Sequence, residues 1–359
     1  MTSRERTLRS LAHQPVDRLP VDFWASDAMI ARIESAFSTS YRAFLDAHDI
    51  DLRYIDGPAY IGPALENGRD IWGVPRVTVR VPVKYGTEVY KDVTDFPLAR
   101  ATAVADVEQY DHWPSPDWFD YSPVKAQCDA LHEQGRAVVF MGDRMNRVAQ
   151  LKPAMYIRGV ENILMDLALN PDIAHEIINR IRAFYEEYLR RILDAARGGI
   201  DIVFTGDDFG SQNGPLMSLA MWRAFIRTGF GSYIRIAKDH GCTVMHHTCG
   251  AVSEMLPDMI DCGLDVLQSV QPEAAGMSLA ALKKRYGARI GFHGGISIQQ
   301  TRPFGTPADI ERDVSAIRKL FKDDGGYIFC TAHNIQADTP IENVAALLEA
   351  YRHHPGASG

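Results

Sequence analysis

The sequence predicts an α/β fold of the TIM-barrel class, a (β/α)8 barrel in which parallel strands alternate with helices. Three observations support this prediction: short apolar runs recur along the chain, longer segments with helical periodicity separate them, and polar residues collect directly after the runs. The chain has 359 residues, of which 46% are hydrophobic and 23% charged. This composition is that of an ordinary globular protein, and we expect one domain over residues 1–359.

The first element is a short helix, because Thr2 and Glu5 have the Thr-x-x-Glu spacing of a capping box. The eight expected strands are apolar runs entered from polar or glycine turns, at residues 19–24, 52–55, 137–141, 201–205, 243–247, 264–268, 289–293 and 327–330. In residues 70–93, by contrast, valines alternate with other residues from Val77 to Val81, and Gly86 marks a turn. This pattern predicts a β-hairpin inserted after the second strand.

The helices between the strands are predicted from apolar residues that recur with helical spacing. The clearest are residues 171–196, 218–240, 252–262, 279–286, 307–321 and 340–352. Pro307 and Pro340 stand where a first helical turn tolerates the missing N–H group. Thr306 and Thr339 precede them and are predicted to be N-caps.

Charge and cysteine content exclude several classes of protein. The formal net charge is −8, which disfavours a nucleic-acid partner. The five cysteines are scattered and odd in number, so we expect no disulfide framework and a reducing, cytoplasmic location. There is no apolar run of about 18 residues, so no membrane span is expected. The first residues also lack the apolar stretch of a signal peptide.

Polar residues directly follow seven of the eight predicted strands. In a parallel barrel these positions meet on one face, which is where active sites lie. The residues that we assign to this face are Asp56, Asp143, Arg144, Asp207, Asp208, His247, Cys249, Gln268, His293, Cys330 and His333. Their convergence favours a functional site over packing.

His247 and Cys249 carry the most specific chemistry on this face. In an extended segment, residues two apart point to the same side, so an imidazole and a thiolate can bind one ion. Nitrogen and sulfur ligands suit Zn²⁺, and three protein ligands with an open position describe a catalytic zinc. Cys330 would supply the third ligand, with His333 as its alternative. The competing interpretation is a buried free cysteine beside a hydrogen-bonded histidine.

Asp207 and Asp208 form a carboxylate pair with two open interpretations. They bind substrate or act as catalytic acid and base, or they cap the helical turn that follows. Gln212 lies four residues beyond Asp208 and is a further candidate for the same pocket.

Arginine and aromatic side chains complete the candidates. Arg144 and Arg147 are suited to bind an anionic group, or to pair with nearby aspartates. Trp24 is predicted to line a substrate pocket. For Tyr60 and Trp72 two interpretations are open, a pocket wall or the buried core.

The chain resembles the uroporphyrinogen decarboxylase superfamily, and most closely its corrinoid-linked methyltransferases. The motifs that carry the resemblance are Arg4-Glu5-Arg6, Asp17-Arg18-Leu19-Pro20, Gly206-Asp207-Asp208-Phe209-Gly210-Ser211-Gln212, Trp222-Arg223, His247-Thr248-Cys249-Gly250, Leu267-Gln268-Ser269-Val270-Gln271-Pro272, His293-Gly294-Gly295 and Thr339-Pro340-Ile341-Glu342-Asn343. The decarboxylases carry an arginine-rich segment after the first strand, whereas residues 23–28 of this chain contain no arginine. The resemblance therefore implies the barrel fold but argues against tetrapyrrole decarboxylation.

The methyltransferase branch binds zinc through a His-x-Cys motif after the fifth strand and a cysteine after the eighth. His247 and Cys249 match that motif, while the family's last cysteine would fall nearer His333 than Cys330. The resemblance implies methyl transfer between a small methylated substrate or thiol and a corrinoid (cobalamin) on a separate protein, or tetrahydrofolate.

Two alternatives remain open. One is a metal-independent decarboxylase that uses Arg144, Arg147 and Asp207. The other is a non-catalytic subunit that binds a corrinoid or a metal.

Overall fold

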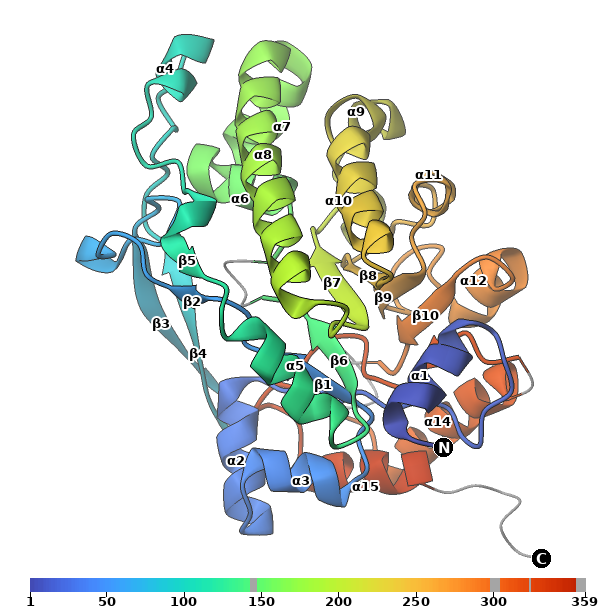
Figure 1. The fold of residues 1–359 in the computed structure, drawn as a ribbon. Coiled ribbons are helices and arrows are strands. Elements are labelled where there is room, and N and C mark those ends of the chain that lie inside the picture. Colours follow the sequence, from blue (N-terminus) through green and yellow to red (C-terminus); the bar gives the residue numbers. More distant parts are fainter. Residues whose placement is uncertain (143–146, 298–303, 323, 353–359) are drawn as a thin grey trace, which may run out of the picture.

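The computed structural model describes residues 1–142, 147–297, 304–322 and 324–352 (Figure 1). Its centre is a parallel sheet of seven strands in the order β1-β6-β7-β8-β9-β10-β11. The strands are β1 (Leu52–Ile55), β6 (Ala137–Phe140), β7 (Ile202–Gly206), β8 (Thr243–His247), β9 (Val266–Val270), β10 (Gly291–Gly294) and β11 (Tyr327–Ile328). These are seven of the eight predicted strands, and each pairs with the next along the chain, as a βα repeat requires.

The segment predicted as the first strand links the two edges of this sheet. Val21 pairs in parallel with Phe329, directly after β11. The N–H of Asp22 donates to the carbonyl of Phe329 at 2.8 Å, and the N–H of Asp51 donates to the carbonyl of Val21 at 2.9 Å. The sheet therefore curls so far that residues next to its first and last strands both bond to this segment.

Helices lie outside the sheet, as α8 and α10 do side by side in Figure 1. The helices are α1 (Ser3–Leu11), α2 (Asp27–Phe37), α3 (Tyr41–Ala47), α4 (Val104–Glu108), α5 (Val124–His132), α6 (Leu151–Arg158), α7 (Val160–Leu169), α8 (Pro171–Ala196), α9 (Leu219–Phe225), α10 (Arg227–Asp239), α11 (Leu256–Asp261), α12 (Leu279–Tyr286), α14 (Pro307–Phe321) and α15 (Ile341–Arg352), with 3-10 turns at Glu66–Gly68 and Pro116–Trp118. The predicted bounds of α8, α12 and α14 are confirmed, whereas the segment predicted at 218–240 is divided into α9 and α10.

Local capping signals explain where several helices begin. The hydroxyl of Thr2 accepts from the N–H of Glu5 at 3.1 Å, which confirms the cap of α1. At α14, the hydroxyl of Thr306 accepts from the N–H of Asp309, and the Asp309 carboxylate accepts from the N–H of Thr306 at 2.8 Å. Because both bonds are local, the residues alone were sufficient to predict these starts.

Residues 70–93 contain two antiparallel strands that stand apart from the main sheet in Figure 1. β3 (Arg76–Val83) pairs with β4 (Gly86–Val93) along their whole length. Glu88 attaches this hairpin to the rest of the chain, since its carboxylate accepts from the Ser26 hydroxyl at 2.8 Å and from the N–H of Ala337 at 2.6 Å. A shorter pair, β2 (Ala59–Tyr60) with β5 (Phe119–Asp120), lies nearby in the sequence.

The core has two parts. A small apolar cluster of strand residues, namely Leu52, Ala137, Val139, Ile202, Phe204, Met245, Val266 and Ile328, packs on one face of the curled sheet. A larger cluster joins the strands to the helices. Among the described residues, no helix is long and apolar enough to span a membrane.

Candidate metal site and its surroundings

Three donor side chains meet at the carboxyl ends of the strands. His247 is the last residue of β8, Cys249 lies two residues further on, and His333 lies in the segment after β11. One donor atom from each lies within 4.8 Å of the others, and we call these residues the donor cluster. The sequence predicted the first two as ligands and His333 as the alternative third.

Neighbouring groups hold His247 in place. Its Nε2 lies 3.4 Å from Cys249 Sγ, and its Nδ1 bonds to Oε1 of Gln268. Gln268 is the register partner of His247 on β9 and is fully buried. Support of this kind orients histidines that bind metals. Gln268 was predicted to bind substrate, but its amide oxygen is engaged by His247.

Asp208 lies beside the donor cluster. One carboxylate oxygen is 3.4 Å from His247 Nε2 and accepts from the N–H of Cys249 at 3.2 Å. The other oxygen pairs with Lys152 at the start of α6. Asp208 thus connects the ends of β7 and β8 to α6.

These neighbours shift the pKa values of the cluster. Burial favours a neutral Asp208, but hydrogen bonding to His247 and the charges of His247 and Lys152 outweigh it and hold the pKa of Asp208 far below its usual range. Burial likewise favours a neutral His247, but Cys249 and Asp208 raise the pKa of His247 to about 9. For His333, burial and the nearby His247 lower the pKa to about 3. Among the described residues, the two histidines therefore differ in basicity because His247 is hydrogen-bonded to Asp208 and Cys249, whereas His333 is bonded to Asn334.

The loops after β7 and β8 touch at their backbones. Gly250 has a φ of +80°, and a Cβ there would lie 2.5 Å from the carbonyl carbon of Gly210 and from the carbonyl oxygen of Ser211. The N–H of Ala251 donates to that Ser211 oxygen at 2.7 Å, and the N–H of Phe209 donates to the Thr248 hydroxyl at 3.0 Å. Only glycine fits at residue 250, and the close contact determines where Cys249 lies.

An aromatic wall lies on one side of the cluster. The Trp24 ring is 5.4 Å from that of His333 and 6.1 Å from that of His247, measured between centroids. The Arg147 guanidinium lies 5.5 Å from the centre of the Trp24 ring and 5.0 Å from that of Phe204. The predicted pocket residue Trp24 is therefore adjacent to the donor cluster, with a cation across its face.

Asp207 serves a different purpose from Asp208. Its carboxylate accepts from the backbone N–H groups of Gln150 at 2.6 Å, Leu151 at 2.9 Å and Lys152 at 2.6 Å. Burial outweighs these donors and raises the pKa of Asp207 to about 6. This geometry corresponds to the capping alternative, but the helix is α6, which precedes Asp207 in the chain, and not the turn that follows it. In the part of the chain that the structure describes, the Asp207 carboxylate is engaged by α6, which gives no support to the predicted catalytic role.

Cys330, the first choice for the third ligand, is not in the donor cluster. It belongs to a second group of donor atoms with Asp22 and His293. The reason is the path of the chain after β11: Cys330 lies two residues beyond the strand and is 1% exposed, whereas His333 lies three residues further along, in the segment that reaches Trp24. His293 was predicted to bind substrate, but it is fully buried and bonds to Asp22.

The remaining predicted residues are dispersed. Asp56 and Gln212 are exposed, unlike the buried His247. Asp143 and Arg144 lie outside the described residues. Tyr60 and Trp72 pack in the apolar core, away from the cluster. His246, the neighbour of His247 on β8, turns away from the cluster, since it stacks on Phe209 and bonds to Thr205.

Sequence reasoning missed Asp22, Lys152 and Phe204 as neighbours of these donor groups. Asp22 carried a signal that was available, because a carboxylate within an apolar strand must have a buried partner. Lys152 and Phe204 carried none, since their position depends on how α6 and β7 pack.

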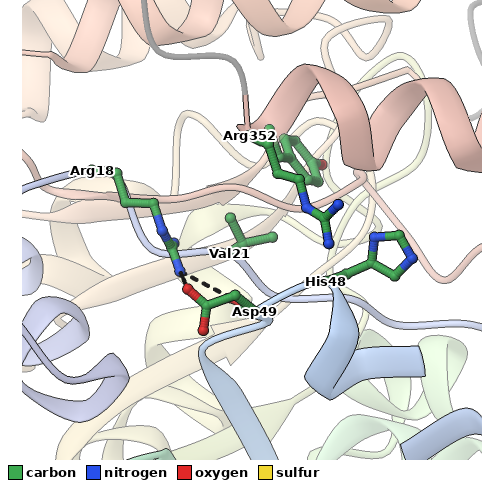
Figure 2. Close-up of a pocket in the computed structure, with 6 residues that line it drawn as sticks. Arg18, Val21, His48, Asp49 and Arg352 are labelled. Atoms are coloured by element: carbon green, nitrogen blue, oxygen red, sulfur yellow. Dashed lines mark hydrogen bonds and ion pairs between the residues drawn. The ribbon is translucent and has the colours of Figure 1, made fainter. Parts of the chain in front are cut away.

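A small pocket lies elsewhere, between the start of the segment at Val21 and the end of α15 (Figure 2). It is lined by Arg18, Val21, His48, Asp49, Tyr351 and Arg352. Figure 2 shows Arg18 bonded to Asp49, with Arg352 and His48 opposite. This pocket contains no residue of the donor cluster and lies near the amino end of β1, the face associated with stability in barrels.

Comparison with known proteins places the chain in context. A family model described as uroporphyrinogen decarboxylase (URO-D) matches residues 2–354. The chain is 27% identical over 241 residues to the methylated-thiol–coenzyme M methyltransferase of Methanosarcina mazei, covering 63% of this chain and 61% of that protein. It is 31% identical over 153 residues to the methylcobamide:CoM methyltransferase MtaA of Methanosarcina barkeri, covering 42% and 41%.

Two longer matches complete the comparison. The uroporphyrinogen decarboxylase of Coxiella burnetii is 21% identical over 355 residues, which cover 96% of this chain and 94% of that protein. A solved structure of a methyltransferase from Methanosarcina mazei superposes with a TM-score of 0.67 at 19% identity and covers 98% of both chains. The fold is therefore shared along the whole chain, while the match to the first of these methyltransferases spans less than two thirds of that protein's length.

Proposed function

Since the chain belongs to the uroporphyrinogen decarboxylase (URO-D) family, we propose that it is the zinc-dependent methyltransferase type within that family. It moves a methyl group between a small methylated substrate or thiol and a corrinoid, a cobalamin-type cofactor, on a separate protein. Tetrahydrofolate is the alternative carrier. The observation that carries the proposal is the donor cluster of His247, Cys249 and His333. The relatives named as coenzyme M methyltransferases agree with it.

The donor cluster suits a catalytic zinc ion. Two imidazole nitrogens and one thiolate sulfur are donors that Zn²⁺ prefers, and three protein ligands leave one position for substrate. A zinc ion bound there would act as a Lewis acid that lowers the pKa of a substrate thiol or polarises a methylated heteroatom. Gln268 supports such a site, because it bonds to Nδ1 of His247 while Nε2 faces Cys249.

We propose His333, and not Cys330, as the third ligand. Exchange of His333 for cysteine should keep one zinc equivalent at this site, because a thiolate is also a zinc ligand. Exchange of His333 for alanine should lose that equivalent. If His333→Ala keeps the full zinc content of the wild type, this ligand assignment is wrong.

The other side chains have positioning roles in this proposal. Asp208 keeps Cys249 and His247 together through two direct contacts. Asp207 anchors the first turn of α6 and thereby places Lys152 against Asp208. Trp24 presents an apolar surface beside the cluster, which excludes water from a small methylated substrate.

The carrier protein must approach from the side on which the strands end. The β3–β4 hairpin borders that side, because Glu88 bonds to Ser26 and Ala337, which follow Trp24 and His333 in the chain. We further propose that the chain is one domain with a closed (β/α)8 barrel, in which residues 19–24 act as the eighth strand. The reaction belongs in the cytoplasm, where Cys249 stays reduced.

The test is methyl transfer with purified protein. Methylcobalamin is mixed with a panel of thiols that includes coenzyme M, and loss of the methyl–cobalt absorbance is followed while the methylated thiol is identified by mass spectrometry. The reverse reaction is tested with Co(I) cobalamin and a panel of methylated donors. Cys249→Ser should reduce turnover at least a hundredfold. Cys262→Ser, which changes a cysteine next to α11, is the matched control and should be unaffected.

The two alternatives appear as distinct outcomes. If no thiol or methylated donor reacts but uroporphyrinogen loses carboxyl groups as CO₂, the protein is a decarboxylase, as its match to the Coxiella enzyme would allow. If neither reaction occurs and the protein binds a corrinoid or a metal, it is a binding subunit.

A further inference from the structure

A second group of donor side chains lies inside the fold, close to the first. Asp22 is in the segment that links the sheet edges, His293 is on β10, and Cys330 lies two residues after β11. One donor atom from each lies within 4.8 Å of the others. The three residues are 1%, 0% and 1% exposed. We call them the inner cluster.

The inner cluster is separate from the donor cluster but shares a row of the sheet with it. Gln268 on β9 is in register with His247 on β8 and with His293 on β10. Register partners in a parallel sheet direct their side chains to the same face. The two histidines therefore flank Gln268, one in each cluster.

The bonds within the inner cluster leave one buried group without a hydrogen bond of ordinary geometry. Oδ2 of Asp22 accepts from the Tyr54 hydroxyl at 2.6 Å and lies 2.9 Å from Nε2 of His293. Nδ1 of His293 has no hydrogen bond of ordinary geometry among the described residues, although Cys330 is near enough to the ring to interact with it. A buried ring nitrogen without such a bond is rare, and a bound ion is one of the few explanations for it.

Charge is compatible with such an ion. The Asp22 carboxylate pairs with His293 in the structure, and buried charges are tolerated when they are paired. A divalent cation that replaced the protons of His293 and Cys330 would balance the carboxylate and the thiolate, and the neutral imidazole would complete the donor set. Nitrogen, oxygen and sulfur donors together favour Zn²⁺ among the common divalent ions.

We propose that Asp22, His293 and Cys330 form a second binding site for a divalent transition metal, with Zn²⁺ as its expected occupant. Three ligands are fewer than the four of most structural zinc sites, but the burial of all three residues points to a structural role. The ion would join the linking segment to β10 and to the segment after β11. This inference does not depend on the proposed methyl transfer.

The experiment is metal analysis of the whole protein loaded with Zn²⁺ and freed of excess. The wild type should bind two equivalents, Cys330→Ser one, Cys249→Ser one, and the double variant none. Cys262→Ser is the control and should keep two. Cys330→Ser should also lower the melting temperature, whereas Cys249→Ser should leave it nearly unchanged.

Each outcome decides between the two sites. If the wild type binds one equivalent of Zn²⁺, and this equivalent is lost in Cys249→Ser but kept in Cys330→Ser, the second site is overturned. If the single equivalent is instead lost in Cys330→Ser and kept in Cys249→Ser, the second site is supported and the proposed reaction has no metal ion. If Cys330→Ser does not fold, the Cys249→Ser variant is loaded with Co²⁺. A thiolate-to-cobalt absorption band then supports binding by Cys330, and its absence overturns it.

Discussion

Replacing Gly250 by alanine should weaken metal binding without unfolding the protein. Gly250 has a φ of +80°, and an added Cβ would lie 2.5 Å from backbone atoms of Gly210 and Ser211. The left-handed conformation costs a residue with a side chain about 1–2 kcal/mol, and forcing an extra methyl group into a packed site costs about 1–3 kcal/mol. The loop relieves this strain by moving away from Gly210, and Cys249 moves with it.

The strain therefore opposes the geometry that metal binding needs. A penalty of about 2–5 kcal/mol corresponds to a loss of zinc affinity between roughly thirtyfold and several thousandfold if all of it acts on binding. Because part of the strain energy lowers the stability of the fold instead, we expect zinc affinity to fall at least tenfold. Affinity is measured by competition with a chromophoric chelator, in a Cys330→Ser background so that one site is observed.

Gly214→Ala is the matched control. Gly214 lies in the neighbouring loop after β7, and an added Cβ there would meet nothing within 4 Å. Its zinc affinity should equal that of the parent. If Gly250→Ala is folded and its affinity lies within threefold of the control, the contact between the two loops does not position Cys249, and the reasoning fails.

Three further predictions concern stability and the support of His247. Asp51→Asn should lower the free energy of unfolding by about 3–5 kcal/mol, because it breaks a buried pair with Arg6. With an unfolding entropy of about 2.1 cal/mol/K per residue over 359 residues, the melting temperature should fall by about 4–7 °C. An unchanged melting temperature would refute this. The hydrogen bond from Arg6 lowers the pKa of Asp17 to about 2. The bond therefore stabilises the fold above the unfolded-state pKa of the carboxyl group, and this stabilisation is lost as the pH falls towards 2. In urea unfolding, Asp17→Asn should lower the free energy of unfolding more at pH 6 than at pH 3, and an equal effect at both pH values would contradict the prediction. Gln268→Ala should lower zinc affinity about tenfold to a hundredfold, since it removes the partner of His247 Nδ1; chelator competition that detects no change would exclude the supporting role.

Local signals account for the parts of the fold that the sequence predicted well. The bounds of α8, α12 and α14 follow from features within each helix, such as the first-turn Pro307 and the capping hydroxyl of Thr306. Helix α2 was missed although Ser26 caps it by the same kind of bond. The segment at residues 19–24 was predicted as a strand, but its pairing consists of isolated bridges, because the distance between the sheet edges depends on how far the whole sheet curls.

The candidate site shows a similar division. The spacing of His247 and Cys249 was enough to predict that they share a side, because alternation along a strand is local. Alternation also separates Asp207 from Asp208, which are adjacent and therefore point apart, although the sequence was interpreted with both in the pocket. The choice between Cys330 and His333 depends on the path of the chain after β11, and no local pattern encodes it.

The attachment of the β3–β4 hairpin has a consequence for how the protein can diversify. The Glu88 carboxylate joins the hairpin to the chain on both sides of the site, while Val77, Val81, Val89 and Tyr90 are exposed. Substitutions at those outer positions are free to alter what docks against the hairpin without disturbing the buried donors. If the proposed carrier docks on this hairpin, its recognition and the binding of the proposed metal are separate traits, and Glu88 is one residue that connects them.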